Sequence, residues 1–392
     1  MDTTVIIGNG VAGTNAAAAL RKNGYEGAIK LIGEEVALPY QRPSLSKTWL
    51  REQARPNPTP IRPLRFFEDN RIELMRARKV ISIDRTARAI RFSDGKTTKF
   101  DTLILATGAS PRRLDMHEDL KGVHYLRGLG DSAQLRGALT RADCRNVAII
   151  GAGVIGLEVA SAAIEMGKNV TVIESAARAM ARVASPATTN FVTQKLTDAG
   201  VQFLFNKKIE GFRADNHHVS SVNLGDGAEV KADLVFVGIG AAPNVELAQA
   251  AGLDCDNGIC VDEDMRTSDP GIFAIGDCAR SDSTFAPGKL RMETVHNATT
   301  QAQIAAAAIC NKARPAPVPP RFWSDLKGMK VQAIGIAAGY DLVRSNASQD
   351  PLSLEVHLKN GDRLVAAEVV NLPTRQAALA KAISPMVSTS AE

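Results

Sequence analysis

Short apolar runs alternate with amphipathic helical patterns along most of the chain, which is typical of α/β domains. An apolar run near the start is followed by a glycine turn, a helical pattern and another apolar run. The same succession returns about 140 residues later. We therefore predict two βαβ units, the first over strand Val5–Ile7, helix Gly13–Lys22 and strand Ile29–Ile32, and the second over strand Val147–Ile150, helix Val154–Met166 and strand Val170–Ile173.

Two strand-then-bend stretches, Phe100–Arg112 (FDTLILATGASPR) and Leu234–Asn244 (LVFVGIGAAPN), mark places where the chain changes domain. The segment RPAPVPP is a stiff linker. Beyond it, apolar runs and a last helix, Thr374–Ala382, predict a small α+β domain. The 392 residues exceed one ordinary core. We predict a discontinuous first domain over 1–110 and 241–318, a second over 111–240 and a C-terminal interface domain over 319–392.

Composition and charge narrow the function classes. The net charge of +5 is mild, so it favours an acidic partner but does not argue for nucleic acid. No apolar run is long enough to span a membrane, and the chain enters a strand too early for a secretory signal. The cysteines show no disulfide framework and no CxxC pair, so we expect no metal and a reducing, cytoplasmic setting: Cys144, Cys255, Cys260, Cys278 and Cys310.

The first glycine turn has the spacing of a dinucleotide-binding fingerprint. Gly8 permits the tight turn out of the strand, Gly10 lets the backbone approach a pyrophosphate, and Gly13 lets the helix pack closely on the sheet. The helix N-terminus then offers free N–H groups to phosphate. Glu34 follows the second strand, where a carboxylate would hold a ribose.

The second glycine turn repeats this arrangement with Gly151, Gly153 and Gly156, and Glu174 is its carboxylate. Two dinucleotides in one chain suggest hydride transfer from a nicotinamide nucleotide to a flavin. Far along the chain, Gly276-Asp277 ends another strand, and its acid would reach the ribityl chain of FAD. The first unit with this segment is therefore expected to bind FAD, and the inserted unit NADH.

Three further segments carry a resemblance: LPYQRPSLSK (Leu38–Lys47), RMETVHNA (Arg291–Ala298) and FWSD (Phe322–Asp325). With them the chain resembles the FAD-dependent NADH:ferredoxin reductases of bacterial oxygenase systems, over nearly its whole length. The resemblance implies a glutathione-reductase-like fold. It also implies that electrons pass from NADH through FAD to an acidic iron–sulfur ferredoxin. That ferredoxin would supply a Rieske dioxygenase or a haem monooxygenase in aromatic hydrocarbon catabolism.

The resemblance also implies site residues. Lys47 would lie near flavin N5, where its positive charge would stabilise reduced flavin. Trp323 is either a flavin contact or a core residue. The remaining FAD contacts would be Ala12, Arg42, Val80, Arg127, Asp277 and Val295. Around NADH, the glycines would be joined by Ile155, Glu158, Glu174 and Arg182.

Several alternatives stay open. One alternative is rejected: a disulfide reductase of this fold needs a Cys-x4-Cys pair in the helix after Pro39, and this stretch has no cysteine. Other acceptors are rubredoxin, monodehydroascorbate or O2, and a redox-gated binding flavoprotein is a further possibility. Departures from the family pattern, in the basic stretch Arg51–Arg65 and after FWSD, fall where a partner would dock. The cations there are Arg51, Arg55, Arg62, Arg65, Lys327 and Lys330. The sequence leaves monomer and dimer equally open.

Overall fold

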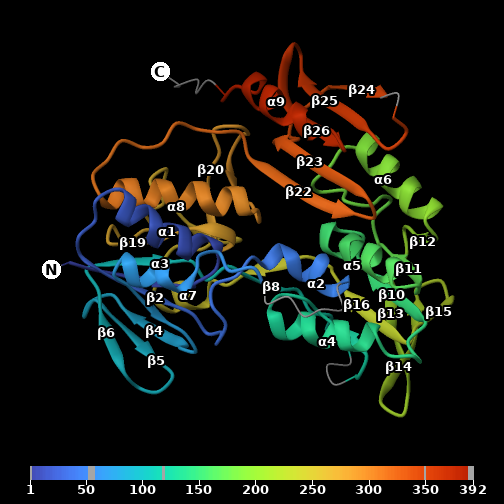
Figure 1. Ribbon diagram of the computed structural model, residues 1–392, viewed down its shortest axis with the longest axis horizontal. Helices are drawn as coiled ribbons and strands as arrows, with labels where there is room; N and C mark the ends of the chain where they lie inside the picture. The colour runs from blue at the N-terminus through green and yellow to red at the C-terminus, as the bar shows by residue number, and fades with distance from the viewer. Residues whose placement is uncertain (1, 52–57, 117–119, 348–349, 387–392) are drawn as a thin grey trace.

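A computed structural model describes residues 2–51, 58–116, 120–347 and 350–386 (Figure 1). Three lobes are visible in it. The first is built from the N-terminal quarter of the chain and a later segment that returns to it, the second from the middle of the chain, and the third from the C-terminal residues. The predicted α/β fold with two dinucleotide-binding domains and a C-terminal α+β domain is confirmed.

The first lobe contains a parallel five-stranded sheet in the order β19-β7-β1-β2-β3. Its central strand β1 is almost wholly buried, as expected for a parallel sheet covered on both faces. Helices α1 and α8 pack side by side on it (Figure 1). The strands are β1 (Thr3–Ile7), β2 (Ala28–Ile32), β3 (Ile72–Met75), β7 (Thr102–Leu105) and β19 (Ile272–Ala274), and the helices are α1 (Val11–Lys22), α3 (Leu64–Asp69), α7 (Glu246–Ala250) and α8 (Val295–Ile309).

A segment between β2 and β3 leaves this lobe and carries the 3-10 helix η1 (Arg42–Ser46) and helix α2 (Thr48–Arg51) towards the second lobe. Pro43 at the start of η1 presets its backbone. The lobe is completed by a small antiparallel sheet of β4 (Val80–Asp84), β5 (Ala89–Phe92) and β6 (Thr97–Lys99). A small mixed sheet is formed by β18 (Ile259–Cys260), β20 (Ala279–Asp282) and β21 (Lys289–Leu290), in which β18 and β20 run parallel.

The second lobe repeats the first, with a parallel sheet in the order β12-β11-β10-β16-β9. Its strands are β9 (Val123–His124), β10 (Asn146–Ile150), β11 (Asn169–Ile173), β12 (Val201–Leu204) and β16 (Leu234–Val237), and its helices are α4 (Leu129–Leu139), α5 (Val154–Glu165) and α6 (Pro186–Asp198). A small antiparallel sheet packs beside it: β13 (Ile209–Asp215), β14 (His218–Leu224) and β15 (Glu229–Lys231).

The chain passes between these lobes through two short strands, β8 (Ala109–Pro111) and β17 (Ala241–Pro243), which pair antiparallel. The C-terminal lobe is an antiparallel sheet in the order β22-β23-β26-β25-β24, with α9 (Gln376–Ala382) against it. Its strands are β22 (Arg321–Leu326), β23 (Met329–Gly335), β24 (Leu342–Ala347), β25 (Leu354–Asn360) and β26 (Arg363–Val370). Within the described parts of the chain, no helix has both the length and the apolar character that crossing a membrane requires.

Candidate functional site

The first glycine turn joins β1 to α1. Its first and third glycines are closely packed, and only its second glycine leaves room for a ligand. Gly8 has φ of +108°, and a Cβ there would lie 2.1 Å from the carbonyl oxygen of Ala106. A Cβ on Gly13 would lie 1.9 Å from the carbonyl oxygen of Gly8. A Cβ on Gly10, in contrast, would meet nothing within 4 Å. The first and third glycines are thus required by packing, and the second faces open space.

The second glycine turn, between β10 and α5, has the same geometry. Gly151 has φ of +99°, and its Cβ would lie 2.5 Å from the carbonyl oxygen of Gly238. A Cβ on Gly156 would lie 2.1 Å from the Gly151 carbonyl oxygen. Gly153 is open, since its Cβ would approach only Gly238, at 3.8 Å.

Both helices that follow these turns begin in a way that suits an anion. The N-cap residues are Gly10 and Gly153, neither helix has a side-chain cap, and neither has an acidic residue in its first turn. The first N–H groups are therefore left for an external acceptor, at the end of the helix where the dipole favours negative charge. The residues present fit the diphosphate of a dinucleotide at each turn.

A chain of polar contacts links the expected FAD residues from three separate segments. Arg127 Nη2 lies 3.3 Å from Asp277 Oδ2, and Arg42 Nη1 donates to the carbonyl oxygen of Arg127 at 3.1 Å. Next to Asp277, a Cβ on Gly276 would lie 2.8 Å from the Ala12 side chain. Burial raises the pKa of Asp277, and Arg127 opposes that rise. The structure thus brings Ala12, Arg42, Arg127 and Asp277 to one region beside the first glycine turn.

The two ribose candidates differ in their surroundings. Glu174 directly follows β11, and its Oε2 accepts the backbone N–H of Ala152 at 2.7 Å. The matching place after β2 is occupied by Gly33, because Glu34 lies one residue further along. The Glu34 side chain is 66% exposed, with Lys79 Nζ 4.0 Å away. Glu34 therefore lies at the protein surface, whereas Glu174 is hydrogen-bonded to the backbone of the second glycine turn.

Lys47 lies at a junction of all three lobes. Its side chain is only 9% exposed, and its Nζ lies 2.8 Å from Oε1 of Glu158 on α5, which is 1% exposed. The C-terminal lobe contributes Ser324 of β22, whose hydroxyl donates to the same oxygen at 2.7 Å. The Ser46 hydroxyl donates to the other oxygen. The sequence predicts Glu158 to contact NADH and Lys47 to lie near the flavin. In the structure the two side chains pair with each other.

The other predicted residues lie in varied settings. Val80 begins β4 and is buried in the first core. Val295 is the first residue of α8, after the N-cap Thr294. Ile155 is 42% exposed at the start of α5, Arg182 lies beside Gly240, and Trp323 of β22 is 37% exposed. Trp323 is therefore not a core residue.

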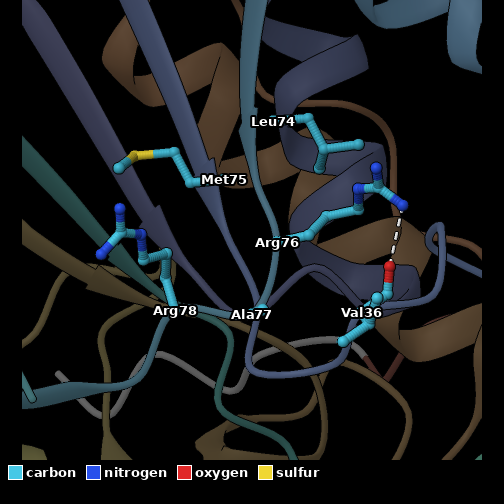
Figure 2. A pocket seen from close by; sticks show the side chains of 6 residues that line it. All are labelled: Val36, Leu74, Met75, Arg76, Ala77 and Arg78. Carbon is cyan, nitrogen blue, oxygen red and sulfur yellow. Dashed lines mark hydrogen bonds between the residues drawn. The ribbon is translucent and has the colours of Figure 1, made fainter.

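A pocket of about 490 Å³ lies at the edge of the first sheet (Figure 2). Val36 lines it after β2, and Arg76 donates to the Val36 carbonyl oxygen at 2.8 Å. The other lining residues come from β3 and the turn after it: Leu74, Met75, Ala77 and Arg78. The pocket includes neither a motif glycine nor Lys47, so it is separate from the contacts described above.

The chain was compared with known proteins. A model of the pyridine nucleotide-disulphide oxidoreductase family matches residues 2–302, and one for the reductase C-terminal domain matches residues 321–392. The chain belongs to the pyridine nucleotide-disulphide oxidoreductase family. Proteins of this family use FAD and NAD(H), and this chain has a dinucleotide-binding fold for each.

Individual relatives match over nearly the whole chain. A rubredoxin-NAD(+) reductase of Pseudomonas putida is 46% identical over 97% of this chain and 98% of its own length. The ferredoxin–NAD(+) reductase component of the biphenyl dioxygenase system of Paraburkholderia xenovorans is 36% identical over 100% and 95%. The reductase in a crystal structure of the covalent putidaredoxin reductase–putidaredoxin complex has a TM-score of 0.92 and 36% identity, covering 97% of this chain and 93% of that one.

Despite the family's name, the chain has no cysteine pair at the site. All five cysteines are unpaired. The buried thiol of Cys278 donates to the carbonyl oxygens of Ile275 and Leu105 at 3.3 and 3.6 Å, and burial raises its pKa. A raised pKa disfavours the reactive thiolate.

Replacing all five cysteines, with alanine at buried positions and serine elsewhere, is expected to leave NADH-dependent flavin reduction within about threefold of the parent. Stopped-flow absorbance of the FAD-loaded protein measures that rate. A collapse of the rate in a variant that still holds FAD would reveal a redox cysteine, with Cys278 the first to restore.

Some participants of the site were not predicted. Glu35 accepts from Arg42 at 2.5 Å and from the Tyr40 hydroxyl at 2.7 Å. Gln301 accepts the backbone N–H of Gly276 at 2.7 Å. The pairing of Glu35 with Arg42 had a local signal, since the two residues lie only seven positions apart in one short loop. Gln301 had none, and for Ser324 the FWSD segment marked the residue but not its partner, because Glu158 is 166 positions away.

Proposed function

We propose that the protein is an NADH:ferredoxin reductase, which passes electrons from NADH through FAD to an iron–sulfur ferredoxin that supplies an oxygenase. The observation that carries the proposal is the buried lysine at the junction of the three lobes. In a disulfide reductase of this fold, a cysteine pair would occupy the segment that here ends in Lys47. With a lysine instead of the cysteine pair, this segment holds no internal disulfide to reduce. The flavin would then pass its electrons to another protein.

FAD, when bound, accepts a hydride from NADH and releases the electrons singly. The chain's own residues bind and orient. The first glycine turn and the start of α1 would hold the FAD diphosphate, with Asp277 and Arg127 beside the ribityl chain. The second turn and α5 would hold NADH, with Glu174 at the adenosine ribose. Glu158 pairs with the Lys47 ammonium at 2.8 Å and fixes it in a buried place.

The partner surface is proposed on the hairpin β22–β23. Trp323 is exposed there, and Lys330 lies opposite Asp325 on the same face. Lys327 forms the turn, and both lysines are exposed. Two cations of the basic stretch Arg51–Arg65 have acidic neighbours: Arg51 pairs with Glu165 at 2.7 Å, and the exposed Arg65 lies 3.5 Å from Asp69, while Arg55 falls outside the described residues. An acidic ferredoxin would therefore meet the two lysines.

Changing both Lys327 and Lys330 to glutamate is expected to raise the apparent Michaelis constant for ferredoxin about tenfold at low salt, because opposite charges steer the encounter. In the parent, salt should slow ferredoxin reduction, since the Debye length falls from about 10 Å at 0.1 M to about 3 Å at 1 M. The double variant should show a flatter salt dependence. Transfer from NADH to the flavin should not change.

The matched control is the double change of Lys96 and Lys99 to glutamate, in and beside β6, at the far end of the first lobe (Figure 1). It alters the net charge equally but not the proposed surface. If both double variants behave alike, net charge and not docking explains the effect. If neither changes ferredoxin kinetics, the surface lies elsewhere.

The 46% identity to a rubredoxin-NAD(+) reductase favours rubredoxin as a second candidate acceptor. A panel decides between the two: NADH-driven reduction of ferredoxins and rubredoxins, with cytochrome c as the readout for the ferredoxins and direct bleaching for rubredoxin. A higher kcat/KM with rubredoxin than with any ferredoxin would contradict the first proposal and favour rubredoxin as the acceptor. Slow turnover with every protein acceptor, O2 and monodehydroascorbate would favour a redox-gated binding role. The unpaired cysteines support a reducing, cytoplasmic setting for any of these partners.

A further inference from the structure

The segment between β11 and α6 carries the residues expected around NADH, and it is held at several points. At its start, Glu174 is bonded to Ala152 of the glycine turn. In its middle, the Met180 N–H donates to the Ala152 carbonyl oxygen at 2.9 Å. Met180 adopts φ of +46°, a left-handed conformation that is unfavourable for a non-glycine residue. Such a conformation persists only where its surroundings hold it.

The end of the segment is held by another lobe. Ser185 is the N-cap of α6, and its backbone N–H donates to Glu368 Oε1 at 2.7 Å. Its hydroxyl donates to Glu368 Oε2 at 2.6 Å. Glu368 belongs to β26 of the C-terminal sheet and is 1% exposed. Both carboxylate oxygens are therefore used by one residue of the nucleotide lobe.

Glu368 is a buried acid without a counter-ion. Among the residues that the structure describes, no lysine, arginine or histidine lies within 4.0 Å of its carboxylate. A buried carboxylate is costly unless hydrogen bonds and local dipoles stabilise it. The start of α6 supplies both, because its N–H groups and dipole favour negative charge. Glu368 is thus held by Ser185, at the end of the segment between β11 and α6.

We propose that Glu368 is a positioning residue for the nucleotide site, through which the C-terminal domain fixes the segment that carries Arg182. Arg182 lies three residues before Ser185 and is itself exposed, with its guanidinium beside Gly240. With the anchor removed, the strained segment relaxes and Arg182 no longer has a fixed place. This inference rests on the proposed NADH site in the second lobe.

The test is the dissociation constant of NAD+, measured by calorimetry on the protein as purified, together with KM and kcat for NADH with ferricyanide as acceptor. Glu368→Gln is expected to raise the dissociation constant and KM about tenfold and to leave kcat within about twofold, because misplacement weakens binding without touching the reacting groups. Ser185→Ala, which loses one of the two hydrogen bonds, should raise both constants about threefold.

The matched control is Glu355→Gln. Glu355 is also buried in the same sheet, at 7% exposed against 1% for Glu368, but it bonds to His357 and Arg375 within its own lobe. It should leave NAD+ binding unchanged. An unchanged dissociation constant in Glu368→Gln and Ser185→Ala, or an equal rise in Glu355→Gln, would overturn the inference. If Glu368→Gln does not fold, the dissociation constant of NAD+ in Ser185→Ala decides whether the inference holds. A parent protein that binds no NAD+ would instead refute the proposed function.

Discussion

Replacing Glu158 with alanine is expected to lower the free energy of unfolding by about 3–5 kcal/mol, because it leaves the Lys47 ammonium buried without a counter-charge. The side chains of the two residues are 9% and 1% exposed and lie 2.8 Å apart. The hydroxyls of Ser46 and Ser324 would lose their acceptor in the same variant. Urea unfolding followed by circular dichroism measures the loss.

A control lies on the same helix. Glu165 of α5 pairs with Arg51 at 2.7 Å, but the two side chains are 24% and 32% exposed. Glu165→Ala should therefore cost less than about 1 kcal/mol. The double variant Lys47→Met, Glu158→Leu should recover part of the stability lost in Glu158→Ala, because apolar residues of similar size replace a buried ion pair at little cost, while the hydroxyls of Ser46 and Ser324 still lack their acceptor. Equal losses in Glu158→Ala and Glu165→Ala would contradict the burial argument.

The double variant also separates stability from function. It should be more stable than Glu158→Ala, yet it has neither the cation nor the anion of the junction. If Lys47 contributes positive charge to reduced flavin, the midpoint potential of bound FAD should be lower in this variant than in the parent. An unchanged potential would mean that the Lys47–Glu158 pair as a whole has no electrostatic effect on the flavin.

The two nucleotide-binding folds could be predicted from sequence because their constraints are local. Gly8 and Gly151 need positive φ, and Gly13 and Gly156 need close packing, so each motif fixes a strand, a turn and a helix within about thirty residues. The predicted strands and helices of both units match the observed ones within about two residues. The last helix is similar: η3 (Pro373–Arg375) takes up its first residues and α9 the rest.

The contacts between lobes could not be predicted in this way. Glu158, Ser324 and Glu368 each bond to a residue of another lobe, and no periodicity or spacing records such a pairing. In the C-terminal domain, two of the five strands were also not predicted from the sequence. β22 was interpreted only as a flavin-flanking segment, and β24 is an edge strand with exposed Leu342 and Val343, so it lacks the alternation that marks a half-buried strand.

NADH is expected to be preferred over NADPH by about a hundredfold or more in kcat/KM, because Glu174 would oppose a 2′-phosphate. At about 4 Å and an effective dielectric constant of about 20, one charge pair repels by about 4 kcal/mol. Glu174 cannot simply turn away, since its two oxygens accept the N–H groups of Ala152 at 2.7 Å and Ala176 at 2.8 Å. Arg178, four residues further along the same segment, already donates to the carbonyl oxygens of Ala184 and Ala181.

Steady-state kinetics with both nucleotides and ferricyanide measure the preference. Glu174→Gln keeps the shape of the side chain and removes its charge, so the preference should fall at least tenfold, mainly through better use of NADPH. Glu210→Gln, at an exposed position on β13 of the same lobe, removes an equal charge away from the turn and should leave the ratio unchanged. Equal kcat/KM for the two nucleotides in the parent would mean that the 2′-hydroxyl does not face Glu174, and the ribose assignment would have to move to another residue of the segment that ends at Ser185.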